Sequence, residues 1–167
     1  MKIPAPSVRF VSDRSLLINW PGQVAIEINH WVQKLFRLLA SSGWEIENLH
    51  PAYSSLLVDF SASTPPDQFL AAVLQVCGSL AYGDATPGRR LELPVIYDGA
   101  DLSDIAQQTG LSVEEVIRVH SDTEYLVAFL GFSPGFPYLM GLREKLFCRR
   151  KSNPRLKVPA GSVAMAG

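Results

Sequence analysis

The amino-acid sequence predicts an α+β protein whose first 97 residues form a ferredoxin-like β-α-β-β-α-β domain. Short segments with apolar residues at alternate positions, bounded by Pro, Gly or Ser, indicate strands. Longer segments with apolar residues three and four positions apart indicate helices. The two kinds of segment follow one another in the order of that domain, and 167 residues suffice for one or two domains with a buried core.

The first half of the predicted domain begins with a strand over residues 15–20, which the pair Pro21 and Gly22 ends. A helix over residues 30–40 follows, with Asn29 as its N-cap and apolar residues at helical spacing. Residues 44–49 then predict a second strand. The first β-α-β unit is therefore complete before residue 50.

The second half begins with a strand over residues 54–60, whose apolar side chains alternate and share one face: Leu56, Val58 and Phe60. Thr64 and Pro65 predict the start of a helix, with Thr as the N-cap and Pro at the first helical position, and Gly78 ends it. The side chains that we expect to form its buried stripe are Phe69, Leu70, Val73, Leu74 and Cys77.

A last strand is predicted over residues 91–97. It belongs at an edge of the sheet, because Pro94 has no N–H to donate to a neighbouring strand. The domain boundary is expected after residue 97, so residues 98–167 belong to a second domain.

Two short helices open this second domain, over residues 102–108 and 113–120. Ser112 and Glu115 have the spacing of a capping box at the start of the second helix. The pair has the look of a DNA-binding helix-turn-helix, but its second helix would present Glu114 and Glu115 to an anionic groove. The sequence therefore argues against nucleic-acid binding.

An apolar segment over residues 125–130 predicts a buried strand and leads into residues 131–141, which contain three glycines and two prolines. This composition predicts a stiff loop whose aromatic side chains pack on core, ligand or partner: Phe132, Phe136 and Tyr138. The loop also contains the G-x-S-x-G pattern of serine hydrolases. We reject a Ser133 nucleophile, because Pro134 has no N–H for the oxyanion hole.

Charge is distributed unevenly along the chain, although the net charge is only −1. Residues 1–142 carry 8 basic and 15 acidic side chains, which gives −7, whereas residues 143–167 carry 7 basic and 1 acidic side chain, which gives +6. The basic tail is either a solvated surface that balances the acidic part or an anion-binding segment. Five cations lie within nine of its residues: Arg149, Arg150, Lys151, Arg155 and Lys157.

Other features bound the class of protein. No stretch is apolar for long enough to span a membrane and no signal peptide is visible, so we expect a cytoplasmic protein. The two cysteines, Cys77 and Cys148, lie far apart and predict reduced, buried thiols rather than a metal site. The three histidines are too scattered for a metal set, and His120 alone is retained as a functional candidate because it can approach residues 131–141.

Two stretches resemble one family closely: residues 131–139, GFSPGFPYL, and residues 154–163, PRLKVPAGSV. The family is that of the B subunit of 5-oxoprolinase, also described as allophanate hydrolase subunit 1 or the Kip-type histidine kinase inhibitor. The resemblance implies an N-terminal α/β domain over residues 1–97 and the start of a cyclophilin-like β-barrel over residues 98–167. Since the family continues through further barrel strands, the barrel is expected to be incomplete, with the chain a fragment.

The resemblance also implies a reaction and partners. Family members pair with the C subunit of 5-oxoprolinase, which is similar to allophanate hydrolase subunit 2. Together with the A subunit, they open the lactam of 5-oxo-L-proline to L-glutamate at the expense of ATP. The implied cofactor is ATP with Mg²⁺, bound with these partners. Other members are described as inhibitors of a sensor histidine kinase, and related domains take part in carboxyl transfer to urea. The alternatives are therefore a binding module that acts on a sensor histidine kinase, or a component of an allophanate- or urea-related amide hydrolase or carboxyltransferase.

Side-chain chemistry then predicts the roles of individual residues. His120 and Arg155 are the catalytic candidates, His120 for proton transfer and Arg155 for a carboxylate or phosphorylated intermediate. The residues expected to bind substrate are Phe136, Pro137, Tyr138, Arg155, Lys157, Gly161 and Ser162. No residue is predicted to bind a metal ion.

Overall fold

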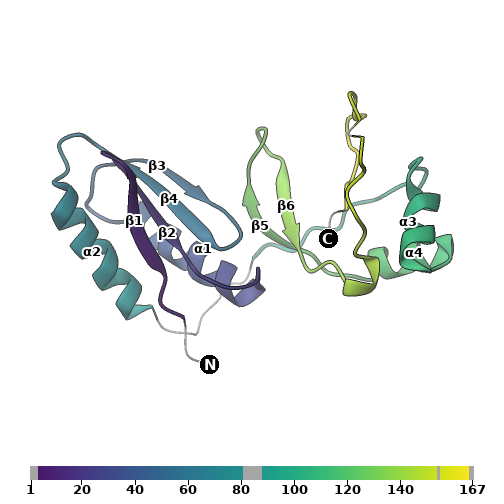
Figure 1. Ribbon diagram of the computed structural model, residues 1–167, viewed down its shortest axis with the longest axis horizontal. Helices are drawn as coiled ribbons and strands as arrows, with labels where there is room; N and C mark the ends of the chain where they lie inside the picture. The colour runs from purple at the N-terminus through teal and green to yellow at the C-terminus, as the bar shows by residue number, and fades with distance from the viewer. Residues whose placement is uncertain (1–3, 81–87, 154, 166–167) are drawn as a thin grey trace. The chain divides into compact units, whose positions relative to one another are not determined.

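The computed structural model describes residues 4–80, 88–153 and 155–165. Figure 1 shows its helices and strands, and its residues divide into two compact units. Unit 1 consists of Met1–Gly88 and Val127–Tyr138, and unit 2 consists of Arg89–Leu126 and Leu139–Gly167. Compact units need not coincide with domains, so the boundary expected after residue 97 stays a prediction.

Unit 1 contains a four-stranded sheet in the order β1-β2-β4-β3, in which all neighbouring strands are antiparallel. The strands are β1 (Ser7–Ser12), β2 (Ser15–Asn19), β3 (Ile46–Pro51) and β4 (Ser55–Phe60). The α+β class and the strands predicted near β2, β3 and β4 are thereby confirmed, although β3 begins two residues later than expected.

The edge of the sheet beside β2 differs from the prediction. Residues 91–97 form no strand, and side chains such as Leu93 and Ile96 are exposed by 78% and 84%. The N-terminal strand β1, which the sequence reading missed, pairs with β2 instead. A hairpin between neighbouring segments closes a much shorter loop than a return from residue 91, and Pro94 lacks a donor for pairing.

Helix α1 (Ile26–Ala40) begins four residues earlier than predicted, and its N-cap is Ala25. Asn29 is therefore not the N-cap. Its side chain is fully buried within the helix and donates hydrogen bonds through Nδ2 to the carbonyl oxygens of Ala52 and Tyr53, both at 3.2 Å, and of Ala128 at 3.4 Å. Backbone acceptors therefore satisfy the donors of this buried amide, whereas its Oδ1 has no hydrogen-bond partner among the described residues.

Helix α2 (Pro66–Ser79) has Pro65 at its N-cap and no side-chain capping hydrogen bond, so the prediction of Thr64 as cap is wrong. The predicted stripe is partly confirmed, since Phe69 and Val73 are fully buried whereas Leu74 is 49% exposed. The buried core of unit 1 joins both helices to one face of β2 and β4, as expected from the alternation along β4: Leu16, Ile18, Trp20, Ile28, Trp31, Val32, Leu35, Leu39, Leu56, Val58, Phe60, Phe69, Val73 and Leu80.

A separate two-stranded sheet is formed by β5 (Leu126–Leu130) and β6 (Pro137–Met140). The strand predicted over residues 125–130 exists, but it is not buried: Ala128 is covered, whereas Val127 and Leu130 are 51% and 62% exposed. Two strands alone bury only part of their side chains.

Unit 2 contains helices α3 (Leu102–Thr109) and α4 (Val113–Ser121) and a short 3-10 helix, η1 (Glu144–Leu146). Both predicted helices and the capping box of Ser112 and Glu115 are confirmed. The helices share a small buried cluster: Ala106, Val116, Val119 and Leu146. Among the described residues from 98 on, the only strands are β5 and β6, so the barrel stays a prediction.

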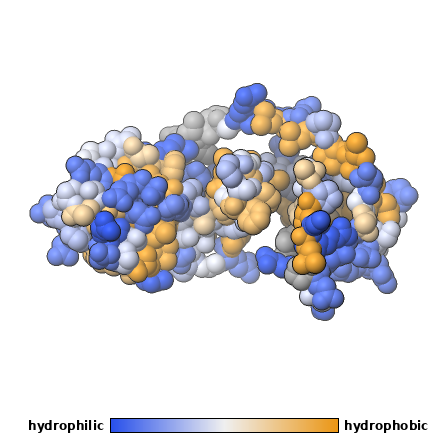
Figure 2. Space-filling view, turned by 90° about the horizontal axis from the view of Figure 1, so that it is seen from above, coloured by the Kyte–Doolittle hydropathy of each residue, from blue (hydrophilic) through white to orange (hydrophobic). Residues whose placement is uncertain are grey.

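The surface carries many apolar side chains among polar ones, which Figure 2 shows as orange areas beside blue ones. Examples in unit 2 are Leu91, 62% exposed, and Leu156, fully exposed. Among the described helices, we find none with the length and hydrophobicity needed to cross a membrane.

Candidate functional site

The β5–β6 hairpin carries a group of packed aromatic rings in unit 1. Phe129 and Tyr138 stack with ring centroids 4.5 Å apart, and Tyr53 meets them edge-on at 5.1 Å and 6.1 Å. Burial, and secondarily the neighbouring Tyr138, raises the pKa of Tyr53. The ring of Tyr138 therefore packs against other aromatic side chains of unit 1, namely Phe129 and Tyr53.

The tip of the same hairpin presents two phenylalanines. Phe132 has a φ of +65°, a backbone conformation that residues other than glycine seldom adopt. Its side chain is 89% exposed. Phe136 is 40% exposed, and its ring lies 5.5 Å from that of Phe132 and 5.2 Å from that of Tyr138. Pro137 is exposed as well. The tip is held in shape by hydrogen bonds from the N–H of Phe136 to Ser133 and of Ser133 to Gly131.

His120 lies in the last turn of α4 and is enclosed by tyrosines in unit 2. Its Nδ1 is 2.7 Å from the hydroxyl of Tyr97, and Tyr125 donates a hydrogen bond to its carbonyl oxygen at 3.3 Å. Burial lowers the pKa of His120 below its usual value of 6.5. The imidazole is therefore neutral at pH 7, which suits a proton acceptor.

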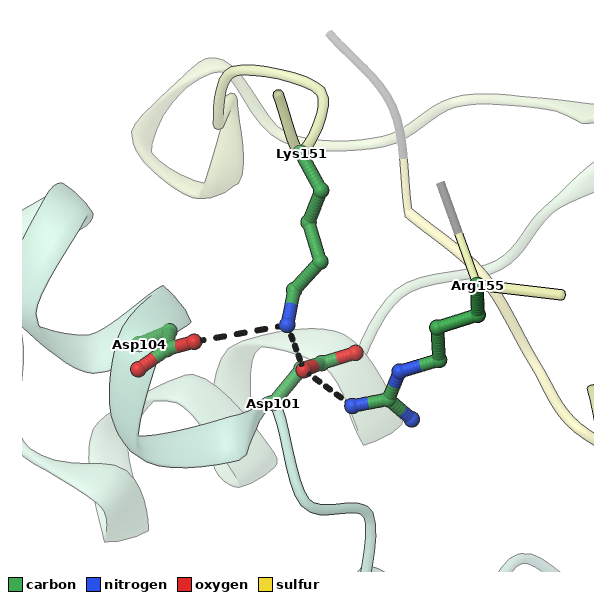
Figure 3. A network of polar contacts seen from close by, with 4 residues as sticks. All are labelled: Asp101, Asp104, Lys151 and Arg155. Carbon is green, nitrogen blue, oxygen red and sulfur yellow. Dashed lines mark hydrogen bonds and ion pairs between the residues drawn. The ribbon is translucent and has the colours of Figure 1, made fainter. Parts of the chain in front are cut away.

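Arg155 belongs to a cluster of four charged side chains, which we call the Asp101 cluster: Asp101, Asp104, Lys151 and Arg155 (Figure 3). The Nη2 of Arg155 lies 2.6 Å from Oδ1 of Asp101, and Lys151 Nζ contacts the same oxygen. Lys151 also lies 3.5 Å from Asp104. The hydrogen bond from Lys151 lowers the pKa of Asp101 and raises that of Lys151. The cluster fixes part of the basic tail against α3.

The other predicted residues of the tail lie in exposed, irregular segments of unit 2. Lys157, Gly161 and Ser162 are all exposed. Ser162 closes a turn, because its N–H and its hydroxyl both donate to the carbonyl oxygen of Pro159, at 3.2 Å and 2.8 Å. Gly161 has a φ of +81°, so a side chain at this position would be strained.

The structure thus divides the predicted site residues into groups. Phe136, Pro137 and Tyr138 belong to unit 1, and the remaining ones belong to unit 2. Within unit 2, His120 and Arg155 have different partners. Their union in one substrate pocket stays a prediction.

Two partners were missed by reading the sequence. Arg155 contacts Asp101, which lies 54 residues away along the chain, and His120 contacts Tyr97, which lies 23 residues away. No local sequence pattern indicates a contact between residues so far apart. The opposite charges of the chain's two parts were the available signal for the first. They favour pairing between acidic and basic segments without saying which residues pair.

An open pocket of about 850 Å³ lies between α3 and the segment after η1 in unit 2. Its lining includes Asp104 and Lys151 of the Asp101 cluster, with Arg149, Arg150 and Gln108. The backbone N–H of Arg149 donates to Gln108 Oε1 at 3.0 Å, which ties the segment to α3. The pocket is polar and positively charged on one side, which favours an anionic occupant.

Within residues 4–80, 88–153 and 155–165, no three His, Cys, Asp or Glu side chains form a group that could hold a metal ion. Both cysteines are free thiols and only partly buried. Burial raises the pKa of Cys77 to about 11, so this thiol is protonated at neutral pH.

Known families and proteins include clear relatives of the chain. Residues 6–167 match the family model described as "Carboxyltransferase domain, subdomain C and D". The chain is 33% identical to the B subunit of 5-oxoprolinase from Haemophilus influenzae, covering 94% of this chain and 74% of that one. It is 37% identical to the corresponding protein of Bacillus subtilis and 52% identical to that of Escherichia coli O157:H7, covering 70% and 47% of this chain. The chain spans 55% and 38% of the lengths of these last two relatives.

Two solved structures resemble the chain. The crystal structure of TTHA0988 superposes with a TM-score of 0.78 at 34% identity, covering 92% of this chain and 31% of that one. The urea carboxylase of Kluyveromyces lactis has a TM-score of 0.59 at 15% identity, covering 83% of this chain and 15% of that one, which shows likeness of fold alone. Together these matches establish that the chain belongs to the carboxyltransferase family of subdomains C and D and, within it, to the proteins named as the B subunit of 5-oxoprolinase.

Proposed function

We propose that the chain acts as part of a subunit of an ATP-dependent 5-oxoprolinase, which opens the lactam of 5-oxo-L-proline to L-glutamate. The observation that carries this proposal is the match to the B subunit of 5-oxoprolinase from Haemophilus influenzae over 94% of the chain. The chain works with two partners, the A and C subunits of the enzyme, and the assembly is cytoplasmic, where ATP is supplied.

Arg155 is the residue proposed to hold the carboxylate of 5-oxoproline. Its guanidinium already binds a carboxylate in the structure, that of Asp101, at 2.6 Å. A guanidinium presents N–H donors in a planar fork that matches a carboxylate, so this chemistry suits the substrate. Lys157 is exposed nearby in the sequence and adds positive charge.

His120 is the residue proposed for proton transfer. Its lowered pKa leaves it neutral near pH 7, so it can accept a proton from the attacking water and then pass that proton to the leaving lactam nitrogen. Phe136, Pro137 and Tyr138 would wall the substrate, with Gly161 and Ser162 as hydrogen-bonding groups.

ATP and Mg²⁺ are assigned to the assembly rather than to this chain. The sequence has no recognisable glycine-rich phosphate loop. We therefore place the binding of Mg-ATP with the partner subunits.

The test is ATP-dependent release of glutamate from 5-oxoproline by the protein co-purified with its partner subunits. We expect turnover to be lost when the protein is omitted and to fall at least about tenfold with Arg155→Ala, because a charge-assisted contact to the substrate is removed. Arg37→Ala, at an exposed arginine on α1, is the matched control. Unchanged turnover without the protein would refute the proposal.

A second candidate function is that of a binding module, such as an inhibitor of a sensor histidine kinase. The observation that favours it is the hairpin tip, where Phe132 is 89% exposed and Phe136 40% exposed. Exposed aromatic side chains often anchor protein interfaces. Inhibition of kinase autophosphorylation that is lost with Phe132→Ser but kept with Arg155→Ala would support this function over the first.

A further inference from the structure

We propose that Lys151 and Arg155 form a carboxylate-binding site which Asp101 occupies in the free protein, so that the carboxylate of a small ligand must displace Asp101 to bind. This inference rests on the proposed function, in which Arg155 holds the carboxylate of 5-oxoproline. It adds Lys151 as the second cation and Asp101 as an internal competitor.

The first support is the convergence of the two cations on one oxygen. Arg155 Nη2 lies 2.6 Å from Asp101 Oδ1, and Lys151 Nζ contacts the same atom (Figure 3). Asp104 contacts Lys151 alone, at 3.5 Å, and lies outside this shared point. The two cations therefore define a position where a carboxylate oxygen is held, and Asp101 fills it.

The second support is that the side chain of Asp101 does not cap α3, although Asp101 is the N-cap residue of this helix. It is the N-cap residue of α3, where an aspartate ordinarily accepts a hydrogen bond from the backbone of the first turn. Its side chain makes no capping hydrogen bond and binds the cations instead. A residue that departs from its local role often serves a functional site.

The third support is that the cluster is accessible and its contacts are exchangeable. The side chains of Asp101, Lys151 and Arg155 are 34%, 43% and 42% exposed. Ion pairs with this degree of exposure are weak, since water competes for both partners. A ligand can therefore replace Asp101 without opening a buried core.

The fourth support is the remaining hydrogen-bonding capacity of Arg155. The contact with Asp101 uses one nitrogen of a guanidinium group that has five N–H donors. A carboxylate that replaces Asp101 can accept from two of these donors at once, which a side chain tethered to α3 does not do here. The cluster holds two cations and two carboxylates, so its formal charge is zero with Asp101 ionised and becomes positive only when the charge of Asp101 is removed, as in Asp101→Asn.

The experiment measures binding of 5-oxo-L-proline to the purified protein by titration calorimetry at low salt. We expect Asp101→Asn to tighten binding about three- to fivefold, because the variant keeps the shape of the side chain and removes the competing charge. Asp104→Asn is the matched control, since it removes a charge beside Lys151 without freeing Arg155, and its effect should stay under about twofold. Arg155→Ala should weaken binding in either background.

An uncharged analogue of 5-oxo-L-proline serves as the control ligand. The uncharged lactam 2-pyrrolidinone lacks the carboxylate, so its binding should not respond to Asp101→Asn. Asp101→Ser serves as a second variant with a good N-cap residue should the asparagine variant fold poorly, and thermal unfolding of each variant checks its fold.

Asp101→Asn binding that is unchanged or weaker than that of the wild type would overturn the inference, as would absence of measurable binding in both proteins. Failure of the proposed function is distinguishable from this result. If Asp101→Asn tightens binding while glutamate release does not require the protein, the carboxylate site stands and the enzymatic role falls. If release requires the protein and Asp101→Asn has no effect on binding, the inference alone falls.

Discussion

Large apolar side chains from the sheet and from helices α1 and α2 fill the interior of unit 1, including Trp20, Phe60 and Phe69. In unit 2, the buried cluster described consists of four side chains: Ala106, Val116, Val119 and Leu146. Polar contacts add to it, among them the capping box of α4 and the Asp101 cluster. We therefore expect unit 1 to supply most of the stability, whereas the charged side chains of the Asp101 cluster in unit 2 are paired in partly exposed contacts.

The largest expected effect tests the core of unit 1. Phe60 is fully buried and its ring centroid lies 4.9 Å from that of Phe69. Phe60→Ala should lower the free energy of unfolding by about 3–5 kcal/mol, because burial is lost and a cavity remains. Denaturant unfolding measures the effect. Phe132→Ala, at a ring that is 89% exposed, is the control and should change stability little, and equal losses in both variants would contradict the comparison.

A smaller loss of unfolding free energy is expected when buried hydrogen bonds of unit 1 are removed. Asn29→Ala removes the donor to the carbonyl oxygens of Ala52, Tyr53 and Ala128, and should cost about 1–3 kcal/mol of unfolding free energy. Gln33→Ala removes one partly buried contact to Ala128 and should cost less. Chemical denaturation of both variants gives the ranking, and the reverse order would show that Asn29 is not a structural anchor.

Removing the side-chain N-cap of α4 in unit 2 should lower the stability of this helix by about 1 kcal/mol. Ser112 Oγ accepts from the N–H of Glu115 at 3.2 Å, and the Glu115 carboxylate accepts from the N–H of Ser112 at 2.9 Å. Ser112→Ala removes the first of these bonds and should destabilise α4 by that amount, measured by hydrogen exchange of its amides. Ser103→Ala, at an exposed position of α3, is the control. Equal protection of α4 in both variants would sink the prediction.

The smallest expected effect is the pH dependence of unit 2. Burial holds the pKa of His120 in the folded protein below the unfolded value of 6.5, so the unfolded chain binds a proton first as the pH falls. The stability that neutral His120 allows is therefore present above pH 6.5 and is lost as the pH falls through the folded pKa. His120→Gln should flatten this part of the stability profile, whereas Arg118→Gln, at an exposed position of the same helix, should leave it unchanged. A profile that keeps its slope in His120→Gln would assign the dependence to another group.

Much of the local structure was predictable from short patterns. The alternation along residues 54–60 indicated β4 and its buried face, and the helical spacing indicated α1 and α2 to within a few residues of their ends. The residues Ser112 and Glu115 identified the start of α4 directly, because a capping box is completed within four residues. Features of this kind depend on neighbours in the chain.

The partners within the site were less predictable. The sequence marked Arg155 and His120 as candidates from their chemistry. The structure shows what each contacts: Asp101 for Arg155, and Tyr97 and Tyr125 for His120. The aromatic side chains of the loop also differ in burial: Tyr138 packs beside Phe129, whereas Phe132 is exposed. A list of residue types does not contain these distinctions, because each depends on where distant segments come to lie.

The sequence by itself determined the class of fold, the positions of most helices and strands, and the family, because these rest on local periodicity and on contiguous motifs. Only the tertiary structure decided that β1 rather than residues 91–97 completes the sheet, that Asn29 is buried rather than a cap, and that Asp101 binds Arg155. In each of these cases several partners satisfy the same local rules. Competition among long-range contacts within the folded chain selects one of them.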